Sequence, residues 1–356
     1  MTPKIISESA LAALVANLVA GQVRVIAPVR AKDNPEHADY LPIRRLEDAA
    51  CNGPLPRRSL KEFFLPPTEV LLRYRQHKDG VDLEEVRTTF PPQVILGARP
   101  CDAAGVEILD KVMGWDYRDE LWFGRREATT IIGLACPGVD DSCFCSAVGL
   151  GPDSTKGSDL LLVPCDGGYL AQAVTPKGEA LLNKEPLQAA PDAAAGQTVE
   201  ALWQGPREKV AKNLPPVPST LPEWLAKSFN HSYWNSLALR CHGCGACASL
   251  CPTCHCFDIV DQHEHYDQGE RRRNWDSCQT GKFTLHASNY NPRKTQSERF
   301  RQRVTHKFSI YPQRFNSLLC TGCGRCARVC PAGMNLPEIL GELTQLAGTE
   351  VKGASE

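Results

Sequence analysis

The feature that most constrains this chain is a four-cysteine run that occurs twice. Cys241-x2-Cys244-x2-Cys247-x3-Cys251-Pro recurs as Cys320-x2-Cys323-x2-Cys326-x3-Cys330-Pro. Each copy matches the run that holds [4Fe–4S] clusters, in which the fourth cysteine ligates the other cluster of a pair. The spacing therefore predicts two clusters with exchanged fourth ligands. The first is held by Cys241, Cys244, Cys247 and Cys330, and the second by Cys320, Cys323, Cys326 and Cys251.

The alternative for these runs is a pair of zinc sites. Structural zinc sites favour two separated C-x2-C pairs, whereas each run here is continuous. Glycines at 243, 245, 322 and 324 let backbone amides approach cluster sulfurs, and the proline after each run suits the first turn of a helix. The runs start 79 residues apart between helical segments. We therefore expect a helical dicluster domain rather than a compact βαββαβ ferredoxin.

The number and setting of the cysteines support metal or redox chemistry. The chain has 17 cysteines among 356 residues, and reduced cytosol does not sustain disulfides. The sequence contains no run of 18 apolar residues, so no transmembrane helix is predicted. The apolar stretch 11–20 lacks a basic n-region, so it predicts a surface helix rather than a signal peptide, and a cytoplasmic protein is expected. A net charge of -1 does not indicate binding to nucleic acid or a membrane.

The rest of the chain predicts a mixed α/β domain in front of the helical one. Short Val-, Ile- and Leu-rich segments bounded by Pro, Gly or Asp predict strands at 23–28, 93–98, 129–135, 159–163 and 167–174. Apolar spacing predicts helices at 102–113, 176–183, 221–239, 296–307 and 336–346, with no strand between the last three. The proline-rich run 215–222 indicates a linker. The predicted class is mixed α+β: an N-terminal α/β domain over 1–215, then a helical ferredoxin-like dicluster domain over 216–356.

Four cysteines of the N-terminal part form another candidate set. Cys101 and Cys136 each follow a predicted strand, where α/β proteins place their sites. The pair Cys143 and Cys145 follows in a loop with Gly and Asp. Two interpretations are open, namely a third [4Fe–4S] cluster or buried free thiols, on Cys101, Cys136, Cys143 and Cys145. Iron content separates them, because about eight iron atoms per chain indicate two clusters and about twelve indicate three.

Two weaker signals lie in the C-terminal part. Cys254, Cys256 and Cys278 are a weak metal set with His255 or Asp258 as fourth ligand, and packing around the second cluster is the favoured alternative because no four-cysteine set is complete. Residues 271–314 contain eleven Lys or Arg and two acidic residues. This segment is either a docking face for an acidic partner, a screen for cluster charge, or a solvated helical face.

The chain lacks the motifs of a self-contained reductase. There is no G-x-G-x-x-G fingerprint after a strand, no Walker A loop and no nucleophile–base arrangement. No histidine has metal-ligand spacing with another. We assign no catalytic residue and infer that flavin, nicotinamide and any catalytic metal sit in other subunits.

The wider sequence is similar to a known family. The strings RCHGCGACASLCPTCHCFDIVD, NWDSC, FTLHASNYNPRKTQSERFRQRVTHKFS and CTGCGRCARVCP resemble the beta subunit of cytosolic NAD(P)-linked [NiFe] hydrogenases of the sulfhydrogenase type. They also resemble its relative, the A subunit of anaerobic sulfite reductase. KEFFLPPTEVLLRY, GARPCDAAGVEILD and CFCSAVGLGP extend the resemblance over nearly the whole chain.

The resemblance implies a role between two partners. One is a flavin subunit that exchanges hydride with NAD(P)H, and the other is a catalytic module. That module is the small and large subunits of a [NiFe] hydrogenase or, alternatively, the catalytic subunit of a sulfite reductase. RPCD and CFC lie in the family pattern, which favours a cluster on the N-terminal cysteines.

Three functions compete on this sequence. The first is an electron-transfer subunit. The second is a reductase that binds its own flavin, or an iron with an open coordination position, in the N-terminal domain. The third is a scaffold subunit whose clusters serve only to stabilise its fold. A flavin spectrum of the isolated chain would favour the second, and clusters that the physiological donor does not reduce would favour the third. We favour electron transfer, because two adjacent clusters form a relay.

Overall fold

The computed structural model describes residues 4–86, 89–136, 138–184, 186–187 and 195–353. Its N-terminal part is built on a seven-stranded sheet in the order β1-β9-β8-β7-β6-β2-β3. The four central strands are parallel and the outer ones antiparallel. The central strands are β2 (Arg24–Arg30), β6 (Gln93–Ala98), β7 (Thr129–Leu134) and β8 (Leu160–Cys165). The outer strands are β1 (Lys4–Ile6), β9 (Gly168–Ala173) and β3 (Ala38–Ile43).

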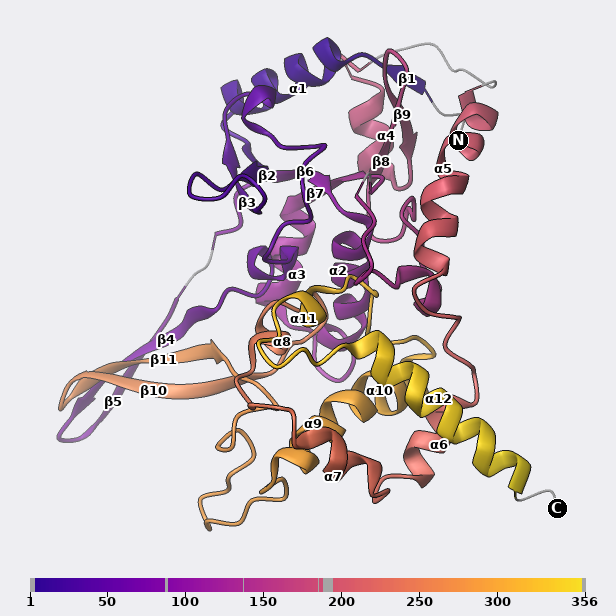
Figure 1. Ribbon diagram of the computed structural model, residues 1–356. Coiled ribbons are helices and arrows are strands. Elements are labelled where there is room, and N and C mark those ends of the chain that lie inside the picture. The colour runs from indigo at the N-terminus through magenta and orange to yellow at the C-terminus, as the bar shows by residue number, and fades with distance from the viewer. Residues whose placement is uncertain (1–3, 87–88, 137, 185, 188–194, 354–356) are drawn as a thin grey trace.

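Helices cover both faces of this sheet, because its strands are apolar on both sides. On one face, α1 (Glu8–Ala20) and α4 (Pro176–Leu182) pack on side chains such as Leu96 and Ile132. On the other, α2 (Pro100–Met113) and α3 (Glu120–Ala128) pack on Ile95 and Ile131. Trp203 of α5 (Ala195–Ala211) covers the β8 end of that face. The three layers are visible in Figure 1.

The C-terminal part is mainly helical, as predicted. Its apolar core joins α6 (Leu221–Lys227), α7 (Tyr233–Ala238), α9 (Gln296–Thr305) and α12 (Leu336–Gly353). A π-helical turn, His306–Ile310, and α10 (Tyr311–Phe315) continue α9. Two four-residue helices, α8 (Ala246–Ser249) and α11 (Arg325–Arg328), lie side by side between these helices and the sheet (Figure 1).

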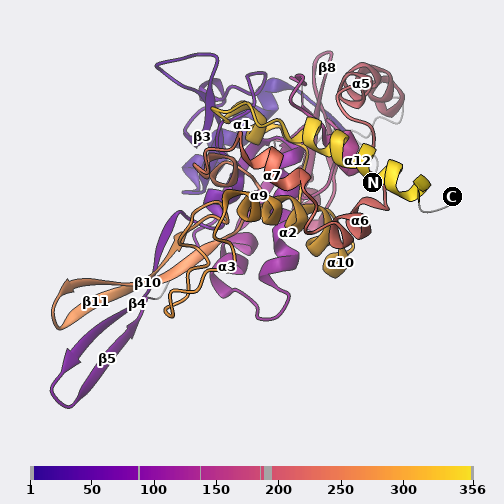
Figure 2. The ribbon, with the colours of Figure 1, turned by 60° about the horizontal axis from the view of Figure 1, so that its bottom comes forward.

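A four-stranded arm projects from the body, in the order β10-β11-β4-β5 (Figures 1 and 2). It pairs β4 (Thr68–His77) and β5 (Gly80–Glu85) with β10 (Phe257–His265) and β11 (Gln268–Trp275). The prediction of no strand in the C-terminal part is therefore wrong. Mixed polar side chains hide these strands from a pattern search, and β11 is held by pairing with the distant β4.

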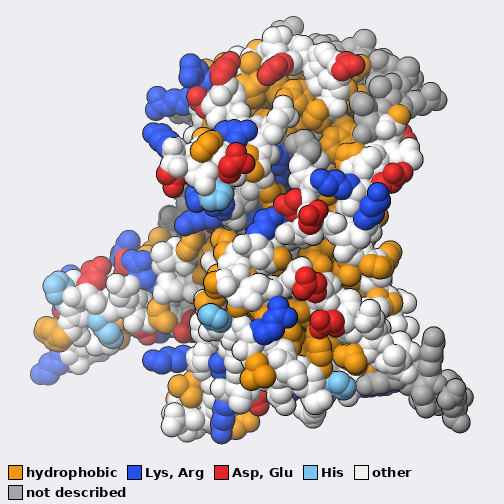
Figure 3. All heavy atoms as spheres, viewed as in Figure 1, with side chains coloured by type: hydrophobic (Ala, Val, Ile, Leu, Met, Phe, Trp, Pro, Cys, Tyr) orange, Lys and Arg blue, Asp and Glu red, His pale blue; other side chains and the backbone are white. Residues whose placement is uncertain are grey.

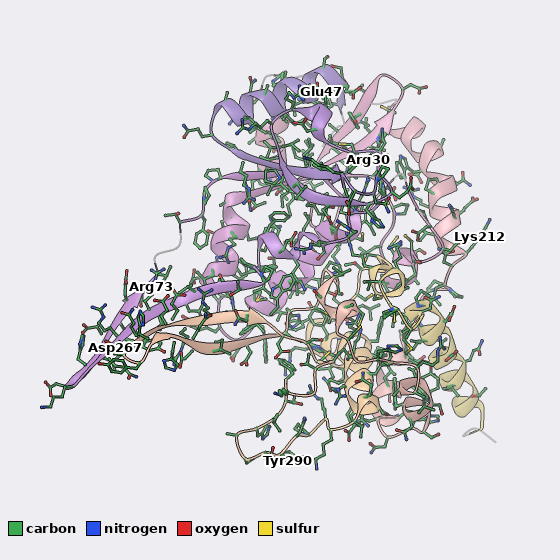
Figure 4. The ribbon with its side chains drawn as sticks, turned by 60° about the vertical axis from the view of Figure 1, so that its left-hand side comes forward. Arg30, Glu47, Arg73, Lys212, Asp267 and Tyr290 are labelled. Atoms are coloured by element: carbon green, nitrogen blue, oxygen red, sulfur yellow. The ribbon has the colours of Figure 1, made fainter. Side chains whose placement is uncertain are left out.

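Most side chains of the arm are exposed or half-buried, and Glu270 and Arg273 of β11 are buried. Figure 3 shows charged, histidine and a few hydrophobic side chains along it. Arg73 and Asp267 lie on it, away from Arg30 and Glu47 of the sheet domain, and Tyr290 lies on a separate loop (Figure 4). The arm joins strands from either side of residue 215, so the two parts of the chain share a sheet. The domain boundary at residue 215 therefore stays a prediction. In the described part of the chain, no helix is long and apolar enough to span a membrane.

Candidate iron–sulfur centres

The two cysteine runs have the same local structure. In each, two glycines adopt left-handed backbone angles, with φ of 67° and 76° at Gly243 and Gly245, and 64° and 70° at Gly322 and Gly324. A four-residue helix follows each pair, as α8 and α11. Residues with a side chain rarely adopt these backbone angles. The glycines therefore allow the loop to place three cysteines around one point. The repeat in the sequence is thus also a repeat in the structure.

The first predicted set lines one cavity. The walls of this cavity include Cys241, Cys244, Cys247 and Cys330. Cys330 comes from the second run, as the exchanged ligation predicts. Phe300, Leu336 and Ile339 close the inner side. Cys244 is exposed, whereas the other 16 cysteines are buried or half-buried.

The second predicted set is a group of neighbouring thiols, of which Cys251, Cys320 and Cys323 are buried. Burial, with a smaller contribution from the neighbouring Cys323, Cys320 and Cys251, raises the pKa of Cys326 to about 12, and nearby Arg303 opposes the rise. Each of the other three thiols therefore neighbours Cys326. Thr253, two residues after Cys251, donates its hydroxyl to the carbonyl of Leu319 at 2.8 Å. That bond fixes the end of the first run against the start of the second.

The N-terminal cysteines also converge on one cavity. This cavity is lined by Cys101, Cys136, Cys143 and Cys145. Cys101 lies in the first turn of α2 after β6, and Cys136 follows the adjacent parallel strand β7. The carboxyl ends of neighbouring parallel strands lie at the same edge, which brings these two residues together. Cys145 begins a short 3-10 turn, Cys145–Val148, and Cys143 lies in the loop just before it.

This third set lies against the second. Cys323 lines the same cavity as the third set, and the amide of Phe144 donates to the carbonyl of Gly322 at 2.8 Å. The side chain of Phe144 packs into the helical core. The CFC segment therefore seals the boundary between the two parts of the chain.

The close packing around Gly322 at this boundary predicts that a side chain at this position would destabilise the protein. A Cβ there would lie 2.5 Å from the backbone of Phe144 and Cys145. We expect Gly322→Ala to push the CFC turn away, lowering the free energy of unfolding by about 1–3 kcal/mol and reducing iron content. Gly333→Ala is the matched control, since its φ is 62° but nothing lies within 4 Å of an added Cβ. Equal urea midpoints and iron contents for the two variants would contradict the contact argument.

Two arginines of α11 join the second and third sets. Arg325 makes two 2.7 Å bonds to the fully buried carboxylate of Asp102, the neighbour of Cys101. Tyr40 also donates to Asp102 at 2.8 Å. Arg328 contacts the Cys143 thiol at 3.1 Å, the Cys323 carbonyl at 2.8 Å and the Asp140 carboxylate at 2.6 Å. The sequence did not predict a role for these charged residues, because an arginine or aspartate taken alone is indistinguishable in sequence from a surface residue.

The three remaining cysteines of the C-terminal part lie beside the second run. The Cys254 thiol accepts a hydrogen bond from Arg303 at 3.2 Å, and Cys278 accepts one from Gln279 at 3.6 Å. His255 turns Nδ1 to the carbonyl of Thr253 at 3.0 Å, and Asp258 is exposed on β10. These contacts do not turn His255 or Asp258 toward a point shared with the three thiols. The weak metal set therefore stays a prediction.

The donor sets fit iron–sulfur clusters. Within the described residues, no three His, Cys, Asp or Glu side chains converge closely enough for a single metal ion. Thiols that line a shared cavity without converging on one point suit a polynuclear cluster better than one zinc ion. Burial raises the pKa of Cys143 to about 11 and of Cys145 to about 12. These thiols therefore stay protonated until a metal displaces the protons.

Two buried histidines beside these sites give a pH prediction. The rings of His255 and His306 lie 5.6 Å apart, and burial lowers their pKa to about 4 and about 3. Both are neutral when folded and gain protons more readily when unfolded, so stability is full above about pH 6.5 and falls as pH drops below it. At pH 5 each of the two histidines lowers the free energy of unfolding by about 2 kcal/mol. We expect the urea midpoint of His306→Gln to fall less than that of the unmodified chain between pH 7 and 5; parallel losses would contradict this.

The cysteine runs, the glycine turns and the shared cavities define a class, the iron–sulfur proteins of the dicluster ferredoxin type. A family model described as a 4Fe-4S dicluster domain matches residues 240–334. The sulfhydrogenase 2 subunit beta of Pyrococcus furiosus is 30% identical over 336 residues, which cover 87% of this chain and 97% of that protein. The chain belongs to this sulfhydrogenase beta-subunit family and is an iron–sulfur electron-transfer subunit. No solved structure matched the chain.

Proposed function

We propose that the chain holds three [4Fe–4S] clusters and carries single electrons between a flavin subunit that reacts with NAD(P)H and a [NiFe] hydrogenase. The related protein is named as a sulfhydrogenase subunit, which supports membership of such a complex. The ligands we propose are the first set, the second set and the N-terminal set defined above. Iron–sulfur clusters supply one-electron chemistry without an open coordination position.

The observation that carries the proposal is the order of the three sets. Cys326 of the second set lines the cavity of the first, and Cys323 lines the cavity of the third. The second set therefore lies between the other two. Such an order suits a path through the chain with an electron partner at each end. The exposed Cys244 gives the first set an accessible side.

The protein's own residues prepare this path. Apolar side chains from α9 and α12 exclude water from the first cavity, and Phe144 does so between the second and third. Gln296 donates to the Cys241 thiol at 3.3 Å, and the Gly322 amide donates to Cys320 at 3.5 Å. Donors to sulfur favour the reduced form of a bound cluster.

The test is metal analysis of the native complex. The complex is purified anaerobically on a tag attached to this chain, and nickel, flavin and iron are measured. Stoichiometric nickel and flavin, with about twelve iron atoms on this chain when isolated, are expected. Flavin and excess iron without nickel would overturn the hydrogenase assignment in favour of a sulfite or related reductase. Iron on this chain with no copurifying redox subunit would overturn the relay.

A further inference from the structure

One side of α9 and the π-helical turn after it donates to sulfur and carbonyl groups of the first cysteine run and of Cys254, three residues beyond it. Arg303 reaches the Cys254 thiol at 3.2 Å and the Cys247 carbonyl at 3.0 Å. Lys307 reaches the Cys251 thiol at 3.4 Å. Positions 303 and 307 are one turn apart, so they share a face. The π turn, His306–Ile310, contains Lys307, and such turns often occur at functional sites.

These two cations are buried without a carboxylate partner. Arg303 is 4% exposed and Lys307 is 2% exposed. The remaining bonds of Lys307 go to the Thr253 hydroxyl at 3.0 Å and the Leu319 carbonyl at 2.8 Å. Among the residues that the structure describes, neither cation has a carboxylate oxygen within 4.0 Å. An uncompensated buried charge is costly, so the sulfur groups are the remaining source of negative charge.

The arginines of α11 are different. Arg325 is paired with Asp102 and Arg328 with Asp140, so their charges are largely neutralised. Two of the buried, unpaired cations beside the sulfurs therefore come from α9 and its continuation, and the third is Lys61, whose ammonium donates to the Ser249 carbonyl at 3.2 Å. In a buried, weakly screened environment, this charge acts strongly on an electron added nearby.

We propose that Arg303 and Lys307 are positioning charges that raise the reduction potentials of the first and second clusters. Lys307 acts on the second cluster through its ligand Cys251, and Arg303 acts on the first through the Cys247 carbonyl. Each electron added to a cluster increases its negative charge, and a fixed cation nearby stabilises that state. The inference rests on the proposed function, because it needs the clusters to be bound at the proposed ligands.

The test is an anaerobic redox titration followed by electron paramagnetic resonance, with iron and sulfide contents measured on the same samples. We expect Lys307→Met and Arg303→Met each to keep full iron and to lower the equilibrium constant for one-electron reduction of a cluster at least tenfold, a shift of about 59 mV. Lys307→Arg keeps the charge and should stay close to the unmodified protein.

Arg301→Met is the matched control on the same helix. Arg301 stacks on Phe229 at 3.7 Å and donates to the Phe229 carbonyl at 3.0 Å, away from sulfur. Its variant should leave the potentials unchanged. If the methionine variants lose iron, Lys307→Gln and Arg303→Gln, which retain a neutral donor, carry the same expectation.

The outcomes separate the two proposals. Full iron with unchanged potentials in the neutral variants overturns this inference and leaves the proposed function standing. Equal shifts in Arg301→Met would also overturn it, since the effect would not depend on contact with sulfur. Absence of cluster iron from the unmodified chain overturns the proposed function itself.

Discussion

Replacing Cys101 by alanine is expected to remove about four iron atoms from each chain, leaving about eight of twelve. Cys101 shares a cavity with Cys136, Cys143 and Cys145, and a cubane cluster that loses one of four thiolates is poorly held. The other two sets draw no ligand from this region, so their iron should remain. Iron and acid-labile sulfide of the anaerobic protein measure the loss directly.

Cys165→Ala is the matched control for this loss. Cys165 is a half-buried free thiol at the end of β8 and packs against the small core around Trp203. Its replacement should leave the iron content unchanged. If Cys101→Ala retains all the iron of the unmodified chain, the N-terminal cysteines are buried free thiols, and the relay shortens to two clusters.

The grouping of the cysteines followed from spacing and from strand order. The run Cys241 to Cys251 and its repeat place three thiols on one loop whatever surrounds them, because the glycine turns are local. Cys101 and Cys136 came together because parallel strands end at a common edge. The main parallel strands were predictable for a similar reason, since each is a short apolar segment between turn residues. The ligand assignments themselves remain predictions.

The arm and the buried charges could not be predicted in this way. Strand β10 has no apolar alternation, and it exists because β11 pairs with β4, nearly 200 residues earlier in the chain. Arg303 and Lys307 belong to a basic segment whose interpretation as a solvated face is wrong for these two residues. Charge patterns identify the side chain but not its burial, which depends on contacts distant in sequence. The screen for cluster charge is the alternative that their sulfur contacts favour.

Asp102→Asn is expected to cause the largest loss of stability of any single charge change at this boundary. The carboxylate is fully buried and is the only carboxylate that Arg325 contacts among the described residues. Asparagine can still accept from Tyr40, but Arg325 is left as an uncompensated buried charge. Removing one partner of a buried pair costs about 3–5 kcal/mol. We expect the urea midpoint of the anaerobic, iron-loaded protein to fall accordingly.

The double variant Asp102→Asn/Arg325→Met distinguishes charge from packing. With both charges removed, no uncompensated ion remains, and replacement of a buried pair by groups of similar volume is often close to neutral. The double variant should therefore recover much of the stability lost in the single one. Asp48→Asn, in the exposed pair with Arg45, should change little. If the single and double variants are equally unstable, the pair acts through shape rather than charge, and the electrostatic link between the second and third sets is wrong.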